Sequence, residues 1–233
     1  FPERNFRFIC AVATNVARAF AGIHSAGHIV GDINHAHMLV DPADGRVTFI
    51  DTDSFQVQSG GVTFPCDVGA PNFQPPELQS VKSFVGLPRT ENHDRFGLAV
   101  ILFHLLFMGR HPFAVKWTGS GDMPVAKAIA ADYFAFSSGT RSTHVNQPPG
   151  TLGLSEFGDA IANLFESAFK PSSWGERPSA RQWIGELESL SGSLTNENCK
   201  GSGSTKSRHW SPGTSKVFIG EDDRELTVLE GAD

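Results

Sequence analysis

The chain has 233 residues, 39% of them hydrophobic, and carries 25 acidic against 19 basic side chains, which gives a formal net charge of −6. This length accommodates one sizeable domain or two small ones, with enough apolar residues for a buried core. The negative charge argues against a surface that binds nucleic acid. Cys10, Cys66 and Cys199 are widely spaced and odd in number, which gives no disulfide framework and suits a reducing cytoplasm.

Signals for secretion or membrane insertion are not expected. No signal peptide opens the sequence. The longest apolar run, Phe96–Met108, is shorter than the about 20 residues that a helix needs to cross a bilayer. We therefore expect a cytoplasmic protein without membrane contact. The chain begins at Phe1 rather than Met, so we expect a fragment or processed form with further sequence upstream.

Residues 5–26 are predicted to form the first helix. Apolar side chains recur at steps of three and four and give the helix one apolar face: Ile9, Val12, Val16, Phe20 and Ile23. Gly27 follows directly, and glycine is a common residue at the C-terminal end of a helix.

The loop after this helix carries four polar candidates, Asp32, Asn34, His35 and His37. Two strand-like runs follow, residues 38–40 and 47–50, separated by an Asp-Gly turn. The second run ends at Asp51 and Asp53. A hairpin of these strands brings Asp32 and Asp51 to the same end. Acidic residues placed at strand ends are a common basis for metal and phosphate chemistry.

Residues 54–75 have turn and loop character, because glycine and proline recur throughout the segment. A loop of this length within a compact domain is normally functional or wrongly assigned. A buried helix is predicted next, because the run 96–108 is almost wholly apolar. Asp94 lies at its start, where the helix dipole favours a carboxylate.

Further helices are expected towards the C-terminus. Candidates are residues 123–136, residues 157–169 and residues 180–190, the last preceded by a Ser-x-x-Gln capping box at Ser179. Residues 191–216 are rich in Ser, Gly, Thr, Asn and Lys and are typical of a flexible linker. Residues 216–229 are a possible short hairpin.

In this order the landmarks resemble the C-terminal lobe of the protein kinases. Val30-Gly31-Asp32 stands where kinases have His-Arg-Asp, and Asp51-Thr52-Asp53 stands where they have Asp-Phe-Gly. Pro75-Pro76-Glu77 resembles the Ala-Pro-Glu motif that closes the activation segment. Arg177-Pro178-Ser179 resembles a late motif whose arginine pairs with that glutamate. Asp94 with the apolar helix resembles the central kinase helix.

The fold implied by this resemblance is α+β and mostly α. It is a kinase-like C-terminal lobe over residues 1–190 with a small β-hairpin that carries the site, and a linker and tail over residues 191–233. No glycine-rich phosphate loop and no Val-Ala-Ile-Lys strand precede residue 5, so the N-terminal lobe is expected to be missing from this chain. The amino-acid sequence around Asp32 and Asp51 is similar to that of a bacterial branch of kinase-like proteins often fused to helix-hairpin-helix segments.

The resemblance also implies roles for the polar residues. Asp32 would be the catalytic base, and Asp51 would hold the metal, Mg²⁺ or Mn²⁺, that binds ATP. Asp53 would assist that metal or cap the next turn. Asn34 replaces a lysine and would contact phosphate without supplying charge. His37 replaces an asparagine on the second metal, which suits manganese better than magnesium.

Three further residues, Glu77, Asp94 and Arg177, are expected to be structural by the same resemblance. Asp94 would hold the backbone of the catalytic loop, and Arg177 would form an ion pair with Glu77. His104, within the apolar helix, is interpreted as a core histidine whose hydrogen bonds are satisfied.

Three functions follow from these interpretations. The first is a Ser/Thr-type protein kinase or kinase-like phosphotransferase that acts on a protein substrate and needs an N-terminal lobe as its partner, so that this chain alone is nearly inactive. The second is a pseudokinase that only binds partners. The third is a metal-dependent hydrolase, because His35 and His37 would point the same way on an extended segment and could join Asp32 and Asp51.

Overall fold

The computed structural model describes residues 6–139, 142–170 and 175–197. Over these residues the fold is α+β and mostly helical, as the sequence predicted. The helices are α1 (Phe6–Ser25), α2 (Glu91–Leu106), α3 (Val125–Ala130), α4 (Asp159–Phe169) and α5 (Ala180–Glu197). The strands form antiparallel pairs: β1 (Met38–Val40) with β2 (Val47–Phe49), β3 (Val57–Ser59) with β4 (Val62–Phe64), and β5 (Lys116–Trp117) with β6 (Val145–Asn146).

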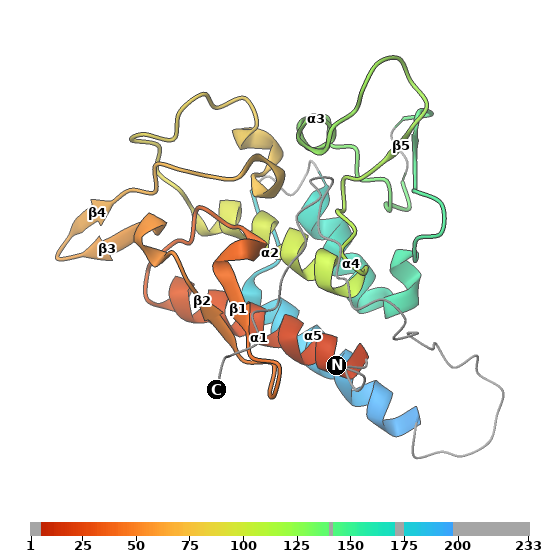
Figure 1. Ribbon diagram of the computed structural model, residues 1–233, viewed down its shortest axis with the longest axis horizontal. Coiled ribbons are helices and arrows are strands. Elements are labelled where there is room, and N and C mark those ends of the chain that lie inside the picture. Colours follow the sequence, from red (N-terminus) through yellow and green to blue (C-terminus); the bar gives the residue numbers. More distant parts are fainter. Residues whose placement is uncertain (1–5, 140–141, 171–174, 198–233) are drawn as a thin grey trace, which may run out of the picture.

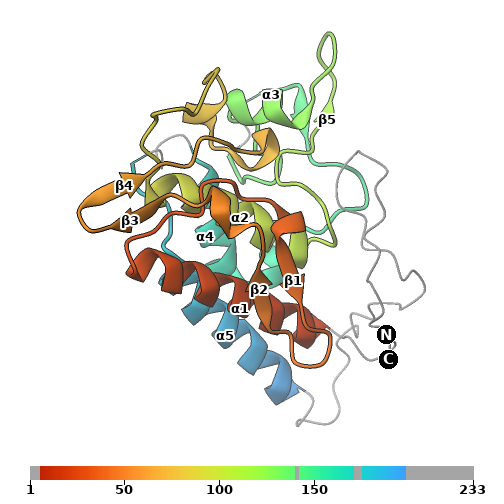
Figure 2. The same ribbon diagram turned by 60° about the vertical axis from the view of Figure 1, so that its left-hand side comes forward.

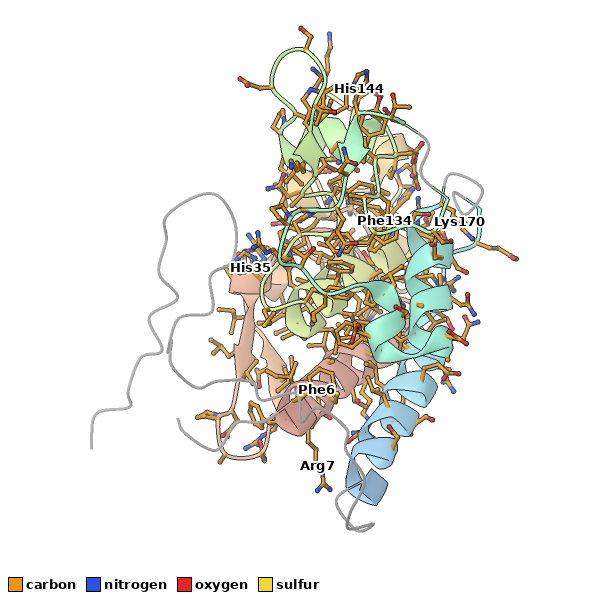
Figure 3. The ribbon with its side chains drawn as sticks, turned by 90° about the vertical axis from the view of Figure 1, so that its right-hand side faces the viewer. Phe6, Arg7, His35, Phe134, His144 and Lys170 are labelled. Carbon is orange, nitrogen blue, oxygen red and sulfur yellow. The ribbon has the colours of Figure 1, made fainter. Side chains whose placement is uncertain are left out.

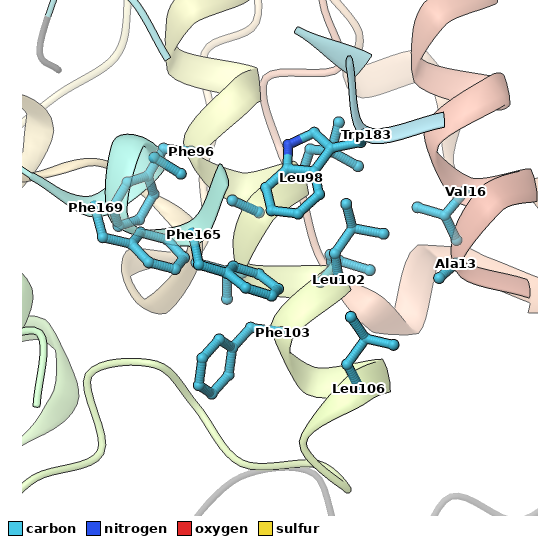
Figure 4. Packing of buried hydrophobic residues seen from close by; sticks show 14 of the residues in the cluster. Ala13, Val16, Phe96, Leu98, Leu102, Phe103, Leu106, Phe165, Phe169 and Trp183 are labelled. Carbon is cyan, nitrogen blue, oxygen red and sulfur yellow. The ribbon is translucent and has the colours of Figure 1, made fainter. Parts of the chain in front are cut away.

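Helix α2 is the centre of the fold. It lies between α1 and α5 on one side and α4 on another (Figure 1). From Phe96 to Leu106 its residues are apolar around the whole circumference apart from His104, and all but Leu105 are buried. Phe103 of α2 packs edge-on against Phe165 of α4, with ring centroids 5.1 Å apart, and Phe165 in turn packs against Trp183 of α5 (Figure 4). The central kinase-like helix that the sequence predicted is therefore present.

Helix α1 has the length and composition of a helix that could span a membrane, with a mean hydropathy of 1.3. It also has a strongly one-sided apolar face, because residues such as Val12, Val16 and Phe20 are buried while others remain at the surface. That face packs against α5, α2 and β2, as the two ribbon views show (Figures 1 and 2). These contacts are those of a helix in the core of a folded domain.

Three predictions of secondary structure were wrong in part. Residues 54–75 contain the β3–β4 hairpin, since Gly60 and Gly61 both adopt positive φ and make a two-residue turn between strands rather than a break. The helix predicted over 123–136 is only α3, and Asp132 after it has a left-handed φ of 55°. Helix α5 continues to Glu197, past the point where a linker was expected. The possible hairpin at 216–229 lies outside the described residues.

Candidate functional site

The loop that follows α1 and carries Asp32 and Asn34 is called the site loop. A single turn of 3-10 helix, residues His35–His37, joins it to the β1–β2 hairpin. Asn34 caps this turn, because its side-chain Oδ1 accepts a hydrogen bond of 3.0 Å from the Ala36 N–H. The Ile50 N–H donates to the His37 carbonyl at 2.9 Å, which closes the hairpin beside the turn. The chain that enters β1 and the chain that leaves β2 are thus held side by side (Figure 2).

His37 lies between the two aspartates that the sequence selected. Its Nε2 is 3.3 Å from Asp51 Oδ2, and its Nδ1 is 4.0 Å from Asp32 Oδ2. The imidazole is mostly buried, with 20% of its side chain exposed, as is Asp32 with 17%, whereas Asp51 has 57% exposed. The prediction that Asp32 and Asp51 meet at one end of the hairpin is confirmed, and the histidine ring is the group that joins them.

Asp51 has an unusual backbone conformation. It lies two residues after the end of β2 with φ 60° and ψ 40°, a left-handed geometry that non-glycine residues adopt infrequently. Such backbone strain is concentrated at functional sites, where the surrounding structure holds it in place. The conformation turns the chain sharply out of β2 and leaves the Asp51 carboxylate beside His37.

The backbone of the site loop is held by Asp94 in the first turns of α2. Its carboxylate accepts hydrogen bonds from the Val30 N–H at 2.8 Å and the Gly31 N–H at 2.9 Å. A third contact joins Asp94 Oδ2 to His24 Nε2 at 2.9 Å, a role for His24 that the sequence did not predict. Asp94 is 1% exposed, so its charge is compensated entirely by these neighbours. The geometry is the one that the resemblance implied for this residue.

The loop also lies close to α2 because of Gly97. A Cβ atom at this position would lie 2.5 Å from Ile33 Cδ1 and 3.1 Å from the Phe73 carbonyl oxygen. Because Gly97 has no side chain, Ile33, the residue after Asp32, packs directly against the backbone of α2. Ile33 is 2% exposed, and its burial anchors the loop from the side opposite to the Asp32 carboxylate's pocket.

The Arg177–Glu77 ion pair predicted from sequence is present. Arg177 Nη1 donates to Glu77 Oε1 at 2.7 Å and Arg177 Nη2 donates to Oε2 at 2.8 Å, a bidentate pair. The Arg177 side chain is 1% exposed and the Glu77 side chain 19% exposed. The pair joins the residues that follow β4 to the segment before α5, over 100 residues of sequence.

The predicted placement of the two histidines differs from the structure. His35 and His37 do not point the same way, because they occupy a 3-10 turn and not an extended segment. The His35 ring faces Phe73 and His104 of α2, with centroid distances of 5.7 and 6.4 Å, at the end of the hairpin next to the core (Figure 3). Asp53 is exposed and forms no ion pair with another described side chain.

The buried histidines of this region remain neutral. Burial lowers the pKa of His104 to about 4, although a hydrogen bond to the Gly109 carbonyl opposes that shift. Burial also lowers the pKa of His111 to about 3, with proximity to His104 as a second cause. His104 Nδ1 lies 3.0 Å from the Gly109 oxygen and His111 Nε2 lies 2.9 Å from the Asn72 oxygen. The interpretation of His104 as a core histidine with satisfied hydrogen bonds agrees with these contacts.

An open pocket of about 540 Å³ lies beside Asp32. The site residues form one wall, and a segment after β4 together with a loop before α2 forms the other. The residues that line it are Asp32, Asn34, His37, Asp67, Val68, Gly69, Ala70, Lys82, Ser83 and Phe84. In the second wall, Gly69 and Ala70 belong to a run, Gly69-Ala70-Pro71-Asn72-Phe73, whose sequence resembles the peptide-docking stretch of kinases, whereas sequence reasoning did not select Asp67, Val68, Lys82, Ser83 and Phe84. The pocket gives the Asp32 carboxylate access to a molecule of side-chain size.

The donor set suits a divalent cation that is only partly held by the protein. Among the described residues, no group of three or more His, Cys, Asp or Glu side chains is arranged to bind a metal ion. His37 Nε2 and Asp51 Oδ2 are 3.3 Å apart, near the separation of about 3 Å between neighbouring ligands at magnesium-like bond lengths of about 2.1 Å. These two side chains fit a cation whose other ligands are phosphate oxygens and water.

The comparison with known proteins agrees with the resemblance. No protein-family model matches the chain. Protein kinase YegI of Escherichia coli K12 is 39% identical over 192 residues, which are 82% of this chain and 30% of that protein. Protein kinase YegI of E. coli O157:H7 is 38% identical over the same shares. The similarity supports a kinase-like relationship.

The extent of the match limits what it transfers. The chain spans about 30% of the length of these bacterial relatives. Their printed name supports kinase-type chemistry with ATP as the general expectation. The acceptor, the metal and the roles of single residues rest on the geometry of the site.

Proposed function

We propose that this chain carries the catalytic loop of an ATP-dependent protein kinase of the Ser/Thr type. The observation that supports it most is the arrangement of His37 between Asp32 and Asp51, at the end of a hairpin whose approach is held by Asp94. In this proposal the base, Asp32, and the metal ligand, Asp51, would lie on either side of one imidazole. The protein would act in the cytoplasm on a protein hydroxyl, together with an N-terminal lobe.

Asp32 would act as the base in this proposal. Its carboxylate lines the pocket, so an acceptor hydroxyl bound there can hydrogen-bond to it and transfer its proton as the phosphoryl group arrives. A base in this position contributes about 10²–10⁴ in rate. The Gly31 N–H bond to Asp94 and the burial of Ile33 keep the loop on both sides of Asp32 in one conformation.

His37, Asp51 and Asn34 would receive the phosphate end of ATP. A divalent cation bound there would offset charge on the phosphate oxygens. Asp51 is exposed enough to reach a cation without moving, and His37 supplies the neighbouring donor. The Oδ1 atom of Asn34 is used in the cap of the 3-10 turn, which leaves its amide N–H groups as neutral donors to phosphate. Asp53, exposed in the next turn, is at most an outer partner of this site.

The test uses the full-length protein, radiolabelled ATP and a generic protein acceptor such as casein. We expect phosphate transfer by the wild type, and a loss of at least about 100-fold in kcat for Asp32→Asn, with ATP affinity unchanged. Arg46→Gln is the control, because Arg46 lies at the far turn of the hairpin and pairs only with exposed aspartates there. Full activity of Asp32→Asn would contradict the proposal.

The pseudokinase is the second candidate, because the two positions that bear a lysine and an asparagine in kinases bear Asn34 and His37 here. It predicts that ATP binds without phosphate transfer under every metal tested. The metal-dependent hydrolase is not proposed again, since His35 faces Phe73 and His104 and is turned away from Asp32 and Asp51.

A further inference from the structure

Gly31, the residue that precedes Asp32, is held through both of its backbone polar groups. The Gly31 N–H donates to Asp94 Oδ1 at 2.9 Å. The Gly31 carbonyl accepts two hydrogen bonds, from Arg89 Nη2 at 2.9 Å and from Gln74 Nε2 at 3.1 Å. Asp94, Arg89 and Gln74 are each 3% exposed or less, so this arrangement is closed to solvent. Rotation of the Gly31–Asp32 peptide, which would move Asp32, requires breaking the buried hydrogen bonds from Arg89 and Gln74 to the Gly31 carbonyl.

Arg89 connects this peptide to the opposite wall of the pocket. Its Nη1 donates to the Val68 carbonyl at 3.2 Å, and Nη2 also donates to Gln74 Oε1. The guanidinium carbon lies 4.5 Å from the centroid of the Phe84 ring. Val68 and Phe84 both line the pocket that Asp32 faces. One planar guanidinium thus joins the site loop and two residues of the facing wall.

The backbone of Arg89 is itself fixed by a reciprocal pair with Gln56. The Arg89 N–H donates to Gln56 Oε1, and Gln56 Nε2 donates to the Arg89 carbonyl, both at 2.9 Å. Gln56 is bound on its other side by a two-way backbone bridge to Ile29, in the segment that leads to the site loop. The network of Gln56, Gln74 and Arg89 therefore contacts the segment that carries Asp32 at two points, Ile29 and Gly31.

The buried guanidinium of Arg89 is an unfavourable choice for a contact that only holds the fold together. Burial of a guanidinium is strongly unfavourable unless its donors and charge are well compensated. The acceptors of Arg89 are the neutral oxygens of Gly31, Val68 and Gln74. Burial lowers the pKa of Arg89, while the nearby Cys66, Asp94 and Asp32 raise it. The guanidinium is thus close to two carboxylates, Asp32 of the site loop and Asp94 of α2, whose charges favour its protonated form.

We propose that Arg89 is a positioning residue that sets the direction of Asp32 and ties it to the Val68–Phe84 wall of the acceptor pocket. The proposal rests on the proposed kinase function. Arginine suits this role because its rigid planar fork binds several oxygens at once, which the single ammonium of lysine cannot do. A displacement of about 1 Å in a reacting group costs about 100-fold in rate, so loss of the clamp acts mainly on kcat.

The experiment compares Arg89→Met, Arg89→Lys and the control Arg95→Met in the full-length protein. Arg95 lies one turn and a half along the chain and contacts Glu91 and the Arg177 carbonyl, not the site loop. Two readouts are taken, kcat and KM for ATP and acceptor, and hydrogen exchange of the Gly31 and Asp32 amides. Arg89→Lys keeps the charge and guards against a Met variant that does not fold.

We expect Arg89→Met to lower kcat about 100-fold with KM for ATP unchanged, and to speed exchange at Gly31 and Asp32 at least tenfold while the interior of α1 stays protected. Arg89→Lys should lose most of the same kcat, and Arg95→Met should retain wild-type values. Wild-type kcat in folded Arg89→Met, or a lower kcat with unchanged exchange at Gly31 and Asp32, would overturn the proposal.

The two proposals fail in different ways. Absence of phosphate transfer by the wild type would refute the proposed function, and the exchange measurement still decides whether Arg89 clamps the Gly31 peptide. Phosphate transfer that is lost in Asp32→Asn but unchanged in both Arg89 variants would support the function and refute the role of Arg89. Rescue of kcat by lysine would show that the charge matters and the geometry of the fork does not, which also refutes the clamp.

Discussion

Arg177 and Glu77 form a bidentate ion pair with both N–O distances below 3 Å, at 2.7 and 2.8 Å, across 100 residues of sequence. The guanidinium also donates to the carbonyls of Ala168 and Asn92. The end of α4, the start of α2 and the segment after β4 therefore share one buried cation. Such a pair fixes the segment that closes the site without taking part in the chemistry.

Replacement of Arg177 by alanine should destabilise the fold strongly. It leaves Glu77 and two carbonyl groups without their donor, and removal of one partner of a buried pair costs roughly 3–5 kcal/mol. The measurement is the midpoint of urea unfolding at pH 7. Arg18→Ala is the matched control, since Arg18 pairs with Glu188 at 2.6 Å but both side chains are more than half exposed, 55% and 51%. Equal midpoints for the two variants would show that burial of the Arg177 pair has no energetic consequence.

Gly31→Ala should damage the site by two separate effects. Gly31 has φ +69°, which strains any other residue, and a Cβ there would lie 2.5 Å from Cys66 Sγ and 2.8 Å from Cys66 Cβ. Gly61→Ala is the control for strain alone, because Gly61 has φ +78° and nothing within 4 Å of its would-be Cβ. We expect a clearly lower melting temperature and loss of phosphate transfer for Gly31→Ala, and a small change for Gly61→Ala.

A double variant separates the two effects at Gly31. Adding Cys66→Gly to Gly31→Ala removes both close atoms while the positive φ remains. The melting temperature of the double variant should be higher than that of Gly31→Ala. It should also be higher than the value expected from adding the effects of the two single changes. Additive changes would mean that the thiol of Cys66 does not occupy the space beside Gly31.

Stability should fall on acidification because of the two buried histidines. The pKa of His104 is about 4 and that of His111 about 3 in the folded protein, against an ordinary value of 6.5. The unfolded chain therefore binds protons that the folded chain does not between pH 6.5 and about 4 for His104, and down to about 3 for His111. The contribution of the two neutral histidines to the free energy of unfolding is complete above pH 6.5 and decreases as the pH falls through this window.

The variant His111→Gln tests this pH dependence. Glutamine can still donate to the Asn72 carbonyl and accept from the Phe113 N–H, but it does not titrate. The difference between the unfolding free energies at pH 7 and pH 4.5 should be smaller in this variant than in the wild type. His144→Gln, at an exposed position labelled in Figure 3, should retain the wild-type difference. An unchanged slope in His111→Gln would mean that the ring is solvated or charged in the fold.

Local sequence patterns were sufficient for much of this fold and for part of the site. The spacing of Val12, Val16 and Phe20 identified α1, and an Asp-Gly turn identified the β1–β2 hairpin, because both signals reside within a few residues. The β3–β4 hairpin escaped although Val62-Thr63-Phe64 repeats the Val-Thr-Phe of β2, because the glycines and prolines of residues 54–75 were interpreted as breaks rather than as turns between strands.

The missed parts of the site depend on contacts that no local pattern encodes. Arg89 and Gln74 meet the Gly31 carbonyl from 58 and 43 residues away. His24 reaches Asp94 over 70 residues. The orientation of His35 was wrong because the chain at that point closes into a 3-10 turn, where residues two apart no longer share a face. Motif order could place Asp32 and Asp51, but not the side chains that hold them.

The imidazole of His37 should alter the metal preference of phosphate transfer. Neutral imidazole suits manganese better than magnesium, which prefers oxygen ligands. We expect the full-length protein to transfer phosphate faster with Mn²⁺ than with Mg²⁺ at saturating ATP. His37→Asn should shift the ratio of the two rates towards Mg²⁺, because it replaces the imidazole with an amide whose oxygen is the kind of ligand that Mg²⁺ prefers.

Asp51→Asn completes this test, since the Asp51 carboxylate is the ligand that either ion would share. It should abolish transfer with both metals, whereas Asp53→Asn, one turn further along and exposed, should retain the wild-type ratio of the Mn²⁺ and Mg²⁺ rates. The measurement is the initial rate against the concentration of each metal for the wild type and the three variants. If Mg²⁺ and Mn²⁺ support equal rates in the wild type and His37→Asn leaves both unchanged, the His37 ring orients Asp32 and Asp51 through its two nitrogens and is not a ligand of the cation.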